Sequence, residues 1–426
     1  MKRYEKYIAI PSTVSPVMPE AWTAKKLKFI LSYSKGKQPS QLTEEPIGDP
    51  YATMDYLRGR DCILQYPVST EGLVHIDNDS LLVLWDGANA GEFLRGKAGY
   101  LGSTMAVIKA GDNMDKSYLF YLLKGSEALS KMIAGGTTIP HFSPTFFDEV
   151  FAIPSLDEQR KIAAFLDYKT GKIDRLTEIL TARINDLKKY RQSVISEVVT
   201  RGLDLTVQLK SSGVEWIGSI PENWTPLRCG LLFRMGSGTT PKSGNDSYYC
   251  EDGKYWLQTG DLTDGLVYET SKHLSDKAFE DYSLSIYPKG SVVIAMYGAT
   301  IGKLGILDID AATNQACCVF TESDRMINRF AYYCLMASRE SLKSFANGGG
   351  QPNISQAQLK DWKLPVPPIE EQKSIVEYLD RKTKQIDDTI VATEQQIKNL
   401  QAYRISLISE AVTGQIDVRD WKVPVE

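Results

Sequence analysis

Long apolar runs are missing from this 426-residue sequence. It contains no stretch of 18 or more consecutive apolar residues, so no membrane-spanning helix is predicted. The first residues, MKRYEKYIAIPSTVSP, lack the apolar core of a signal peptide. The sequence therefore predicts a cytoplasmic protein. With 42% apolar and 24% charged residues it is an ordinary globular chain, long enough for roughly two to four domains.

Histidine is scarce and the cysteines are not spaced for metal binding. The chain has three scattered histidines and six cysteines, none of them in a C-x-x-C arrangement. A zinc site needs paired ligands of these types at short spacing, so no metal site is predicted. We expect reduced, mostly structural thiols at Cys62, Cys229, Cys250, Cys317, Cys318 and Cys334.

An excess of positive charge is also absent. The net charge is -4, and the largest local excess of basic residues is 10 Lys and Arg against 8 Asp and Glu, in residues 153–207. Proteins that bind nucleic acid by themselves usually carry a basic face. If this chain binds DNA, its positive potential must be local, or a partner must supply much of the contact with phosphate.

A phosphate-binding loop is not predicted. Residues 298–304 read GATIGKL, with three residues between the glycines where that loop has four, and leucine where it has serine or threonine. A second glycine turn, residues 87–92, reads GANAGE and replaces the lysine with Glu92. We expect strand-connecting turns whose glycines allow the backbone to approach a ligand or phosphate closely.

A catalytic centre is missing as well. Glu371-Gln372-Lys373 has the spacing of a nuclease carboxylate and its lysine, and residues 158–160 repeat it as Glu-Gln-Arg. Both stretches follow a proline at the start of a predicted helix, where the helix dipole favours acids. Helix capping explains them, and no methyl-donor motif is present. We therefore predict a chain that is not an enzyme and binds no cofactor or metal of its own.

What the chain has instead is a long internal repeat. Residues 154–200 return as residues 367–413 at a constant offset of 213, with 20 of 47 positions identical. Unrelated sequence would give roughly three identities at average residue usage. Such a match indicates duplication.

Each copy of the repeat carries apolar residues at alternating steps of four and three, the seam of a helix that packs lengthwise on another helix. The seam from Lys172 to Val199 covers 28 residues, about 40 Å of helix. Two ordinary amphipathic helices, buried separately in two domains, are the alternative. The residues expected to pack the helix pair are Ile173, Leu180, Ile184, Leu187, Val194, Ile386, Ile390, Ile397, Leu400 and Leu407.

The repeat extends to the segments that precede each helix. Pro19-Glu20-Ala21-Trp22-Thr23 matches residues 221–225, and Gly36-Lys37-Gln38-Pro39 matches residues 238–241. We expect strands broken by turns at 63–68, 81–87, 104–111, 255–262, 291–298, 303–309 and 316–320, and helices at 116–131 and 325–346. This pattern predicts the α+β class with mostly antiparallel sheet. The expected domains are 1–152 and 208–365, globular, and 153–207 and 366–426, helical.

Polar and basic side chains gather on loops of both globular blocks. Arg, Lys, Gln and Asn can make bidentate contacts to base edges, with Thr as an auxiliary. Each residue could equally be plain solvated surface, but the clusters occur in corresponding places. The candidates are Lys35, Lys37, Gln38, Arg58, Arg60, Arg95 and Lys97 in the first block, and Thr239, Thr240, Lys242, Gln258, Lys303, Asn314 and Gln315 in the second.

The helical repeat resembles the conserved regions of the specificity subunits of type I restriction-modification systems. The string from Pro154 through Glu158-Gln159 to Ile173-Asp174, and its copy from Pro367 to Asp387, carry the resemblance. The Gly298–Lys303 turn and Asn314-Gln315 resemble the family's target recognition domains. Glu92 departs from Lys303, so a phosphate contact does not transfer to the first block.

The resemblance implies a non-catalytic DNA reader with two target recognition domains. Each domain would read one half of a bipartite target in double-stranded DNA. The two helices would form an antiparallel coiled coil as a ruler between them, with internal pseudo-two-fold symmetry. Each half would dock a modification (methyltransferase) subunit, which brings S-adenosylmethionine, and restriction subunits would bring ATP and Mg²⁺. Two alternative functions remain: a single-chain restriction-methylation enzyme and a protein-only coiled-coil adaptor.

Overall fold

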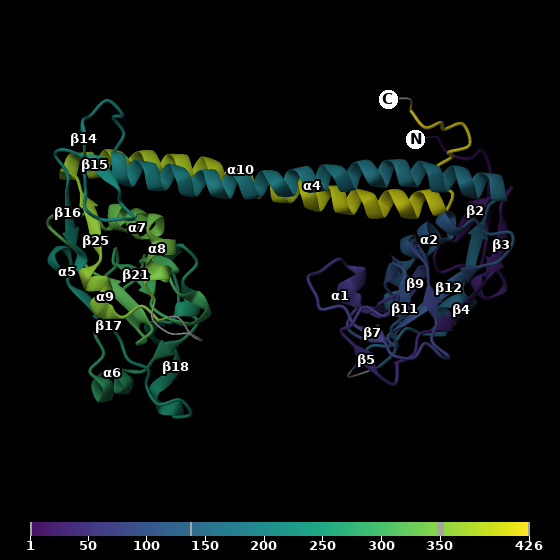
Figure 1. Cartoon of the computed structure of the whole chain (residues 1–426), viewed down its shortest axis with the longest axis horizontal. Coiled ribbons are helices and arrows are strands. Elements are labelled where there is room, and N and C mark those ends of the chain that lie inside the picture. The colour runs from purple at the N-terminus through teal and green to yellow at the C-terminus, as the bar shows by residue number, and fades with distance from the viewer. Residues whose placement is uncertain (1, 137–138, 347–352, 425–426) are drawn as a thin grey trace. The chain divides into compact units, whose positions relative to one another are not determined.

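The computed structural model describes residues 2–136, 139–346 and 353–424, and the chain divides into two compact units. Unit 1 comprises Met1–Thr181 with Glu394–Glu426, and unit 2 comprises Ala182–Thr393. Two long helices, α4 (Leu156–Arg201) and α10 (Ile369–Val412), each contribute one part to each unit (Figure 1). Each unit therefore combines one globular block with parts of both repeat helices.

Unit 1 is built from short strands and short helices that cover or connect them. The helices are α1 (Met54–Leu57), α2 (Lys116–Gly125) and α3 (Glu127–Met132), with a 3₁₀ turn at Pro144–Asp148. The strands are β1 (Tyr7–Ala9), β2 (Val17–Pro19), β3 (Thr23–Lys26), β4 (Leu31–Lys35), β5 (Leu42–Thr43), β6 (Tyr51–Ala52), β7 (Tyr66–Pro67), β8 (His75–Ile76), β9 (Leu81–Leu84), β10 (Phe93–Arg95), β11 (Gly99–Leu101), β12 (Met105–Ala110) and β13 (Val150–Ile153).

The main sheet of unit 1 has the order β10-β9-β12-β4 and is antiparallel throughout. All four residues of β9 are buried because both faces of the sheet are covered. Leu81 and Val83 face the core with α2, whereas Leu82 and Leu84 face a second sheet, β6-β11-β8. Alternate side chains of a strand point to opposite faces, so this position explains the unbroken apolar run.

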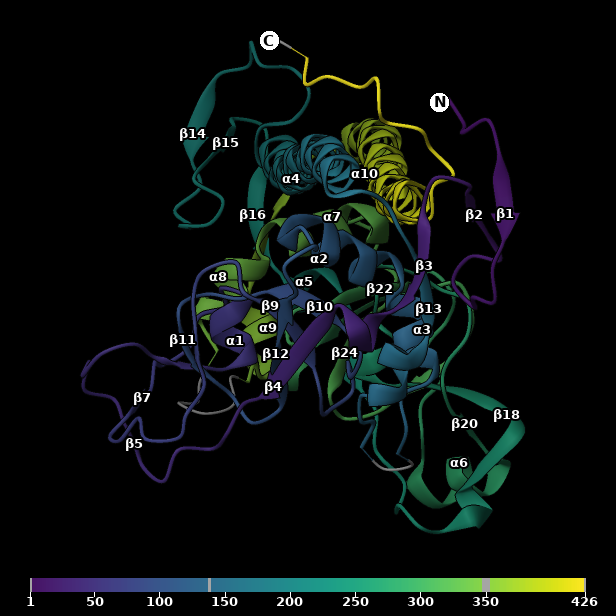
Figure 2. The same ribbon diagram turned by 90° about the vertical axis from the view of Figure 1, so that its right-hand side faces the viewer.

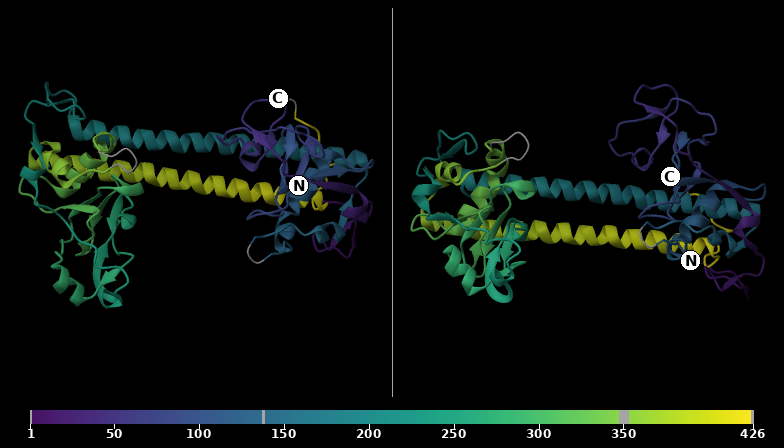
Figure 3. Two further views of the ribbon diagram at one scale, coloured as in Figure 1. Left: turned by 60° about the horizontal axis from the view of Figure 1, so that its bottom comes forward. Right: turned by 90° about the horizontal axis from the view of Figure 1, so that it is seen from below.

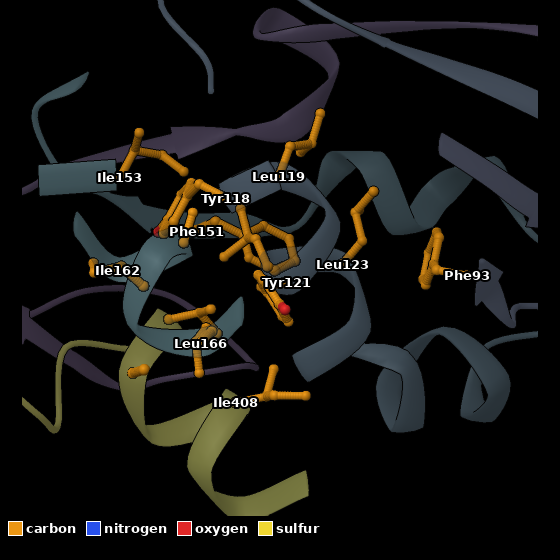
Figure 4. Close-up of a cluster of buried hydrophobic side chains, with 14 of the residues drawn as sticks. Phe93, Tyr118, Leu119, Tyr121, Leu123, Phe151, Ile153, Ile162, Leu166 and Ile408 are labelled. Atoms are coloured by element: carbon orange, nitrogen blue, oxygen red, sulfur yellow. The ribbon is translucent and has the colours of Figure 1, made fainter. Parts of the chain in front are cut away.

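Helix α2 separates the main sheet of unit 1 from the long helices (Figure 2). Tyr118 and Leu119 of α2 are fully buried. The same core contains Ile162 and Leu166 of α4 and Ile408 of α10 (Figure 4). One continuous core thus joins the globular block to both helices of the repeat.

Unit 2 repeats this plan with a five-stranded main sheet. Its helices are α5 (Cys229–Leu232), α6 (Asp276–Tyr282), α7 (Asn328–Ala337), α8 (Arg339–Ser344) and α9 (Gln356–Asp361). Its strands are β14 (Leu209–Ser211), β15 (Ser219–Pro221), β16 (Thr225–Arg228), β17 (Met235–Ser237), β18 (Tyr249–Leu257), β19 (Gly265–Val267), β20 (His273–Leu274), β21 (Val292–Ala295), β22 (Leu304–Leu307), β23 (Ala312–Thr313), β24 (Cys317–Phe320) and β25 (Lys363–Val366).

The main sheet of unit 2 has the order β17-β24-β21-β22-β19, and a smaller sheet has the order β20-β18-β23. The central strand β21 alternates as β9 does: Val292 and Ile294 face the core with α7, and Val293 and Ala295 face the opposite core. The predicted α+β class with mostly antiparallel sheet is confirmed. Parallel pairs occur as well, β6 with β11, β18 with β23, and β19 with β22.

The two long helices pack together in an antiparallel sense (Figure 3). In unit 1, Arg404 donates to Asp174 over 3.0 Å, and in unit 2, Arg191 donates to Asp387 over 2.9 Å. Asp387 and Arg404 stand 213 positions after Asp174 and Arg191, so the repeat makes one ion pair twice with the helices exchanged. Helix α4 is 46 residues long, longer than the 28 residues of the predicted seam.

The predicted seam positions lie mainly on the buried side of the helices. Leu187, Ile397 and Leu400 are half-buried. The other seven are buried: Ile173, Leu180, Ile184, Val194, Ile386, Ile390 and Leu407.

The single helix predicted at the end of each block was wrong, because each is broken at one serine. Helices α2 and α3 meet at Ser126, and α7 and α8 meet at Ser338. Both serines are buried and turn their hydroxyls back onto helix carbonyls, Ser126 to Leu122 over 2.9 Å and Ser338 to Leu335 over 3.4 Å. A hydroxyl that bonds the backbone in this way competes with the regular helix ladder.

All seven predicted strands cover less than the predicted stretch, and two of them depart most from it. Only Tyr66–Pro67 of the stretch 63–68 is a strand, and Ile63 is exposed. The stretch 255–262 forms a strand only to Leu257, after which Gln258 and Asp261 form a capping box on a 3₁₀ turn. The strands predicted at 81–87, 104–111, 291–298, 303–309 and 316–320 correspond to β9, β12, β21, β22 and β24.

The repeated Glu-Gln pairs hold the long helices to the blocks. Gln372 is fully buried; its Oε1 accepts from the Ile327 backbone N–H at 2.8 Å, and its Nε2 donates to the carbonyls of Arg325 and Pro367, both at 2.9 Å. Gln159 makes the corresponding three contacts with residues 115, 113 and 154. The glutamines thus bind the backbone at the start of α2 and of α7 to the long helices, a role that the capping interpretation of these stretches did not include.

Replacing this glutamine is expected to destabilise the protein. Gln372→Ala would leave one buried N–H and two buried carbonyls without a partner, at a cost of roughly 2–4 kcal/mol. Gln385→Ala, at an exposed position of the same helix, is the matched control and should shift stability by less than about 0.5 kcal/mol. Unfolding by denaturant measures both, and equal midpoints would contradict the buried role of Gln372.

Candidate functional site

The first-block candidates divide between two places in unit 1. Lys35 ends β4, and its Nζ lies 3.0 Å from Asp86 and 5.4 Å from the centre of the Trp85 ring. Nearby in sequence, Lys37 and Gln38 are exposed, and Gln38 accepts a bond from the Tyr51 hydroxyl over 2.9 Å.

The second place lies around α1 and the end of the main sheet. Arg58 donates to Glu92 over 2.7 Å, and Arg60 donates to Asp55 over 3.1 Å. Lys97 donates to the backbone carbonyl of Tyr56 over 2.9 Å. The structure thus brings the segment after α1 against residues 92–97, which sequence reasoning had not connected.

Arg95 is not on a loop, contrary to the prediction. It lies on β10, with its guanidinium 4.5 Å from the centre of the Phe120 ring and 3.7 Å from Asp167 of α4. In unit 2, Arg329 lies 2.8 Å from Asp380, the repeat equivalent of Asp167. These positions connect Arg95 to the scaffold between block and helix.

The second-block candidates are closer together. The Trp256 indole N–H donates to the Thr239 carbonyl over 3.2 Å, and the Thr240 hydroxyl donates to the Gln315 side chain. Asn314 donates its backbone N–H to Leu257 over 3.0 Å, directly before Gln258. Thr239, Thr240, Gln258, Asn314 and Gln315 therefore meet where β18 and β23 end.

Glycine is required at the start of this cluster. A Cβ on Gly238 would lie 1.6 Å from the carbonyl oxygen of Thr313, and one on Gly36 would lie 2.2 Å from that of Gly102. Because the backbones touch here, the Gly36 and Gly238 match seen in the sequence marks one shared crossing in both blocks.

Lys242 and Lys303 lie apart from that cluster. Lys242 donates its backbone N–H to the Tyr282 hydroxyl over 2.9 Å, and its side chain is exposed. Lys303 is exposed and follows Gly302 in the connection between β21 and β22.

The two glycine turns connect neighbouring strands. Gly87, Gly91, Gly298 and Gly302 all have positive φ, at 113°, 86°, 78° and 78°. In each turn the second glycine donates its N–H back to the preceding strand over 2.8 Å, Gly91 to Leu84 and Gly302 to residue 295. The expected strand-connecting turns are therefore present.

A positively charged side chain lies at each of the two glycine turns, although the first turn has Glu92 where the second has Lys303. Glu92 occupies the place of Lys303, but Arg58 lies against it at 2.7 Å, with the two side chains 22% and 31% exposed. The first block thus brings its positive charge from another segment. No pattern in the linear sequence connects residues 58 and 92.

Sequence reasoning missed a polar cluster beside Lys35. Asp86 contacts His141 Nδ1 at 2.6 Å as well as Lys35, and Tyr33 lies 5.3 Å from both the Trp85 and the Phe147 rings. Burial acts to raise the pKa of Asp86, but the bonds to His141 and Lys35 outweigh it and hold the pKa below its usual value. Asp86 is thus a carboxylate at neutral pH. The Lys35 candidate and the aromatic strand ends were the available signals.

Two buried tyrosines join each block to its long helix. The Tyr121 hydroxyl donates to Asp167 over 2.7 Å, and the Tyr333 hydroxyl donates to Asp380 over 2.5 Å. Burial raises the pKa of each tyrosine to about 12, and the neighbouring carboxylate acts in the same direction. Both therefore remain protonated donors at neutral pH.

The acids of the repeat have structural partners. Glu371 accepts from the Trp224 indole over 3.0 Å, and Glu158 accepts from the Tyr4 hydroxyl over 2.5 Å. Within residues 2–136, 139–346 and 353–424, no three His, Cys, Asp or Glu side chains are grouped so as to hold a metal ion. Burial raises the pKa of the Cys318 thiol to about 12. In the same residues, no helix is long and apolar enough to cross a membrane.

Comparison with known proteins identifies the family of this chain. The family model described as type I restriction modification DNA specificity domain matches the chain twice, at residues 19–189 and 221–400. A type I restriction enzyme MjaVIII specificity subunit of Methanocaldococcus jannaschii is 30% identical, over 95% of both chains. The EcoR124I/EcoR124II specificity subunit of Escherichia coli is 23% identical, over 82% of this chain and 84% of the relative.

Solved structures share the fold. A chain from a structural study of assembly and conformational transition of the type I R-M system matches with a TM-score of 0.73 and 16% identity, over 94% of this chain and 99% of that one. The HsdS subunit of Thermoanaerobacter tengcongensis matches with a TM-score of 0.50 and 16% identity, over 94% and 98%. The chain belongs to the type I restriction-modification DNA specificity family and is a specificity subunit, the DNA-recognition component that performs no catalysis itself.

Proposed function

We propose that this specificity subunit reads a bipartite target in double-stranded DNA, one half-site with each of two recognition domains, residues 1–152 and 208–365. The observation that carries the proposal is the twofold match of one family model to one chain. The two blocks share a sheet plan, a glycine crossing and a glycine turn, yet present different side chains on them. A common scaffold with different loops suits two different half-sites. Residues 153–207 and 366–426 form the helical spacer.

The proposed base- and phosphate-contacting residues are the loop candidates of both blocks. In the first block, Lys35, Arg58 and Arg60 already pair with carboxylates, so each can approach DNA only by exchanging one partner for another. Such exchange limits the net electrostatic gain from phosphate. The second block offers mainly neutral amides and hydroxyls, at Thr239, Thr240, Gln258, Asn314 and Gln315. These groups read base edges rather than bind phosphate strongly.

We assign the remaining contacts with DNA phosphate to partner subunits in the complex. We propose that each half docks one modification subunit, which carries S-adenosylmethionine and methylates adenine, and that restriction subunits add ATP- and Mg²⁺-dependent cleavage in the cytoplasm. The repeat supports two equal partners, because the contacts of residues 159, 167 and 174 recur at 372, 380 and 387. Equal scaffold positions suit two copies of one protein.

The proposal predicts activity only in the assembled complex. The purified chain should show no methyltransferase, nuclease or ATPase turnover. Co-expression with a cognate modification subunit should produce adenine methylation at one bipartite sequence across a genome. Sequencing that detects methyladenine measures this outcome. Methylation by the chain alone would favour a single-chain enzyme, and no selective DNA binding with partners present would favour a protein-only adaptor; the comparisons support neither alternative.

A further inference from the structure

The turn after the first block helix lies against the long helix of the other repeat in each unit. In unit 1, a Cβ on Gly125 would lie 3.0 Å from Val412 and 3.3 Å from Ile408, both on α10. In unit 2, the corresponding turn at Ala337 lies beside α4, as the contacts of Gln192 show. The two places are repeat equivalents, so their differences can be compared directly.

In unit 2, polar side chains of α4 bridge to the turn at Ala337. Gln192 donates its Nε2 to the carbonyls of Met336 at 3.3 Å and Ala337 at 3.5 Å, and Arg191 approaches the Met336 sulfur at 3.3 Å. The last carbonyls of a helix have no partner within the helix, and these two end α7. Gln192 therefore caps α7 and spans the gap to α4.

In unit 1 the equivalent of Gln192 is Ile405, which cannot make those bonds. Its side chain is 66% exposed on α10, whereas most of the repeat's apolar positions are buried. Beside it is a groove of about 550 Å³ between α2–α3 and α10, with Ile408 at its base. An exposed apolar wall and a groove at one place on a scaffold are typical of a protein interaction site.

The edge of this groove is basic. Lys124, Lys131 and Arg404 line it, with Glu127 as the one acidic lining residue, and Arg404 is bonded to Asp174 of α4 over 3.0 Å. Glu127 lies 2.6 Å from Lys124 and 2.5 Å from Lys131, so a single carboxylate serves two ammonium groups. The complementary ligand is an apolar side chain flanked by carboxylates.

We propose that this groove, the Ile405 groove, receives a carboxylate-flanked apolar segment of the modification subunit that docks on unit 1. The two modification subunits then bind with unequal affinity, the tighter one on unit 1, because unit 2 has Gln192 bonded across the same position. The inference rests on the proposed docking of two modification subunits. DNA is a poorer occupant, since the exposed wall and the base of the groove are isoleucine side chains.

The test exchanges the two equivalent residues. Ile405→Gln should weaken the tighter docking step roughly tenfold, since it removes most of one buried isoleucine contact, and should leave the weaker step unchanged. Gln192→Ile is the matched control and should leave the tighter step unchanged. Titration of the full chain with modification subunit, followed by native mass spectrometry and calorimetry, resolves the two steps. Because Ile405 is exposed, an unchanged unfolding midpoint is expected for Ile405→Gln and confirms that the variant folds.

The outcomes separate this inference from the function on which it rests. No docking by the natural chain would overturn the two-subunit proposal itself. Two equal docking steps, or an unchanged tighter step in Ile405→Gln, would overturn the groove assignment alone. A loss of the tighter step in Gln192→Ile would place it on unit 2 instead. If Ile405→Gln weakened DNA binding at saturating modification subunit without altering docking, the groove would be a DNA contact.

Discussion

A chain whose residues 23–153 are exchanged for the matching segment of another specificity subunit is expected to methylate a target altered in one half only. The junctions follow from β3 and β13, which pair so that Thr23 lies opposite Ile153. The segment therefore leaves and re-enters the scaffold at neighbouring positions. Trp22 stays with the recipient, because its ring approaches Gly414 at the end of α10.

The exchange must preserve the attachment to the long helix. Gln159 accepts from the Asp115 N–H and donates to the Asn113 carbonyl, and Tyr121 donates to Asp167. A donor segment with an equivalent tyrosine should keep these bonds, since the glutamine contacts are to backbone. The expected effect is complete replacement of one half-site, with the other half-site and the spacer unchanged.

A matched exchange in the second block provides the control. Residues 225–366 are bounded in the same way by β16 and β25, with Thr225 opposite Val366. Its exchange should alter the other half-site alone. Methyladenine mapping reads both variants. Were either exchange to alter both half-sites, the two blocks would not be separate readers.

The long helices and the duplication were predictable because their signals are local and periodic. Heptad spacing placed Ile173 and Ile386 on the buried side, and the repeat offset implied equivalent surroundings. The ion pairs of Asp174 with Arg404 and of Arg191 with Asp387 were not predictable, because each joins residues of different repeats. Only the antiparallel packing brings them together.

The breaks in the block helices show another limit. Ser126 and Ser338 are compatible with a helix by propensity, and only their buried hydroxyls, turned onto the backbone, end one helix and begin the next. Burial in the completed core decides this outcome. It is not visible in a window of sequence.

The candidate site was predictable in kind rather than in detail. Loop position and side-chain type identified Lys35 and Gln315, but the acids that neutralise the cations come from distant segments. Glu92 is 34 positions from Arg58, and Asp86 is 51 positions from Lys35. Composition had shown no overall excess of positive charge, so any positive potential had to be local. The contacts show an acid paired with each of Lys35, Arg58 and Arg60.

The last prediction is that the length of the helix pair sets the spacing between half-sites. Helix α4 passes from unit 1 into unit 2 after Thr181, and α10 passes from unit 2 into unit 1 before Glu394. An insertion must therefore be made in both helices at these points, away from the helix ends. The end of α4 is unsuitable, because Val199 is fully buried and a Cβ on Gly202 would lie 3.2 Å from the Trp224 ring.

Four residues inserted in both helices are expected to lengthen the central spacer. They add about 6 Å and turn the helix by about 400°, which leaves an excess of about 40°. A 6 Å shift equals nearly two base pairs at about 3.4 Å each, over which DNA turns by roughly 60°. The two rotations differ by only about 20°, so the second domain should still meet its groove. An insertion of four is also tolerated in coiled coils as a local unwinding.

Two residues inserted at the same points should abolish recognition. They turn each helix by about 200°, which moves the seam beyond the insertion to the opposite side of both helices. Ile184 and Ile386 on one side could then no longer pack in phase with Ile173 and Leu407 on the other. Genome-wide methyladenine mapping compares the variants. A four-residue variant that keeps the original spacer, or a two-residue variant that retains full activity, would show that the helix pair does not set the distance.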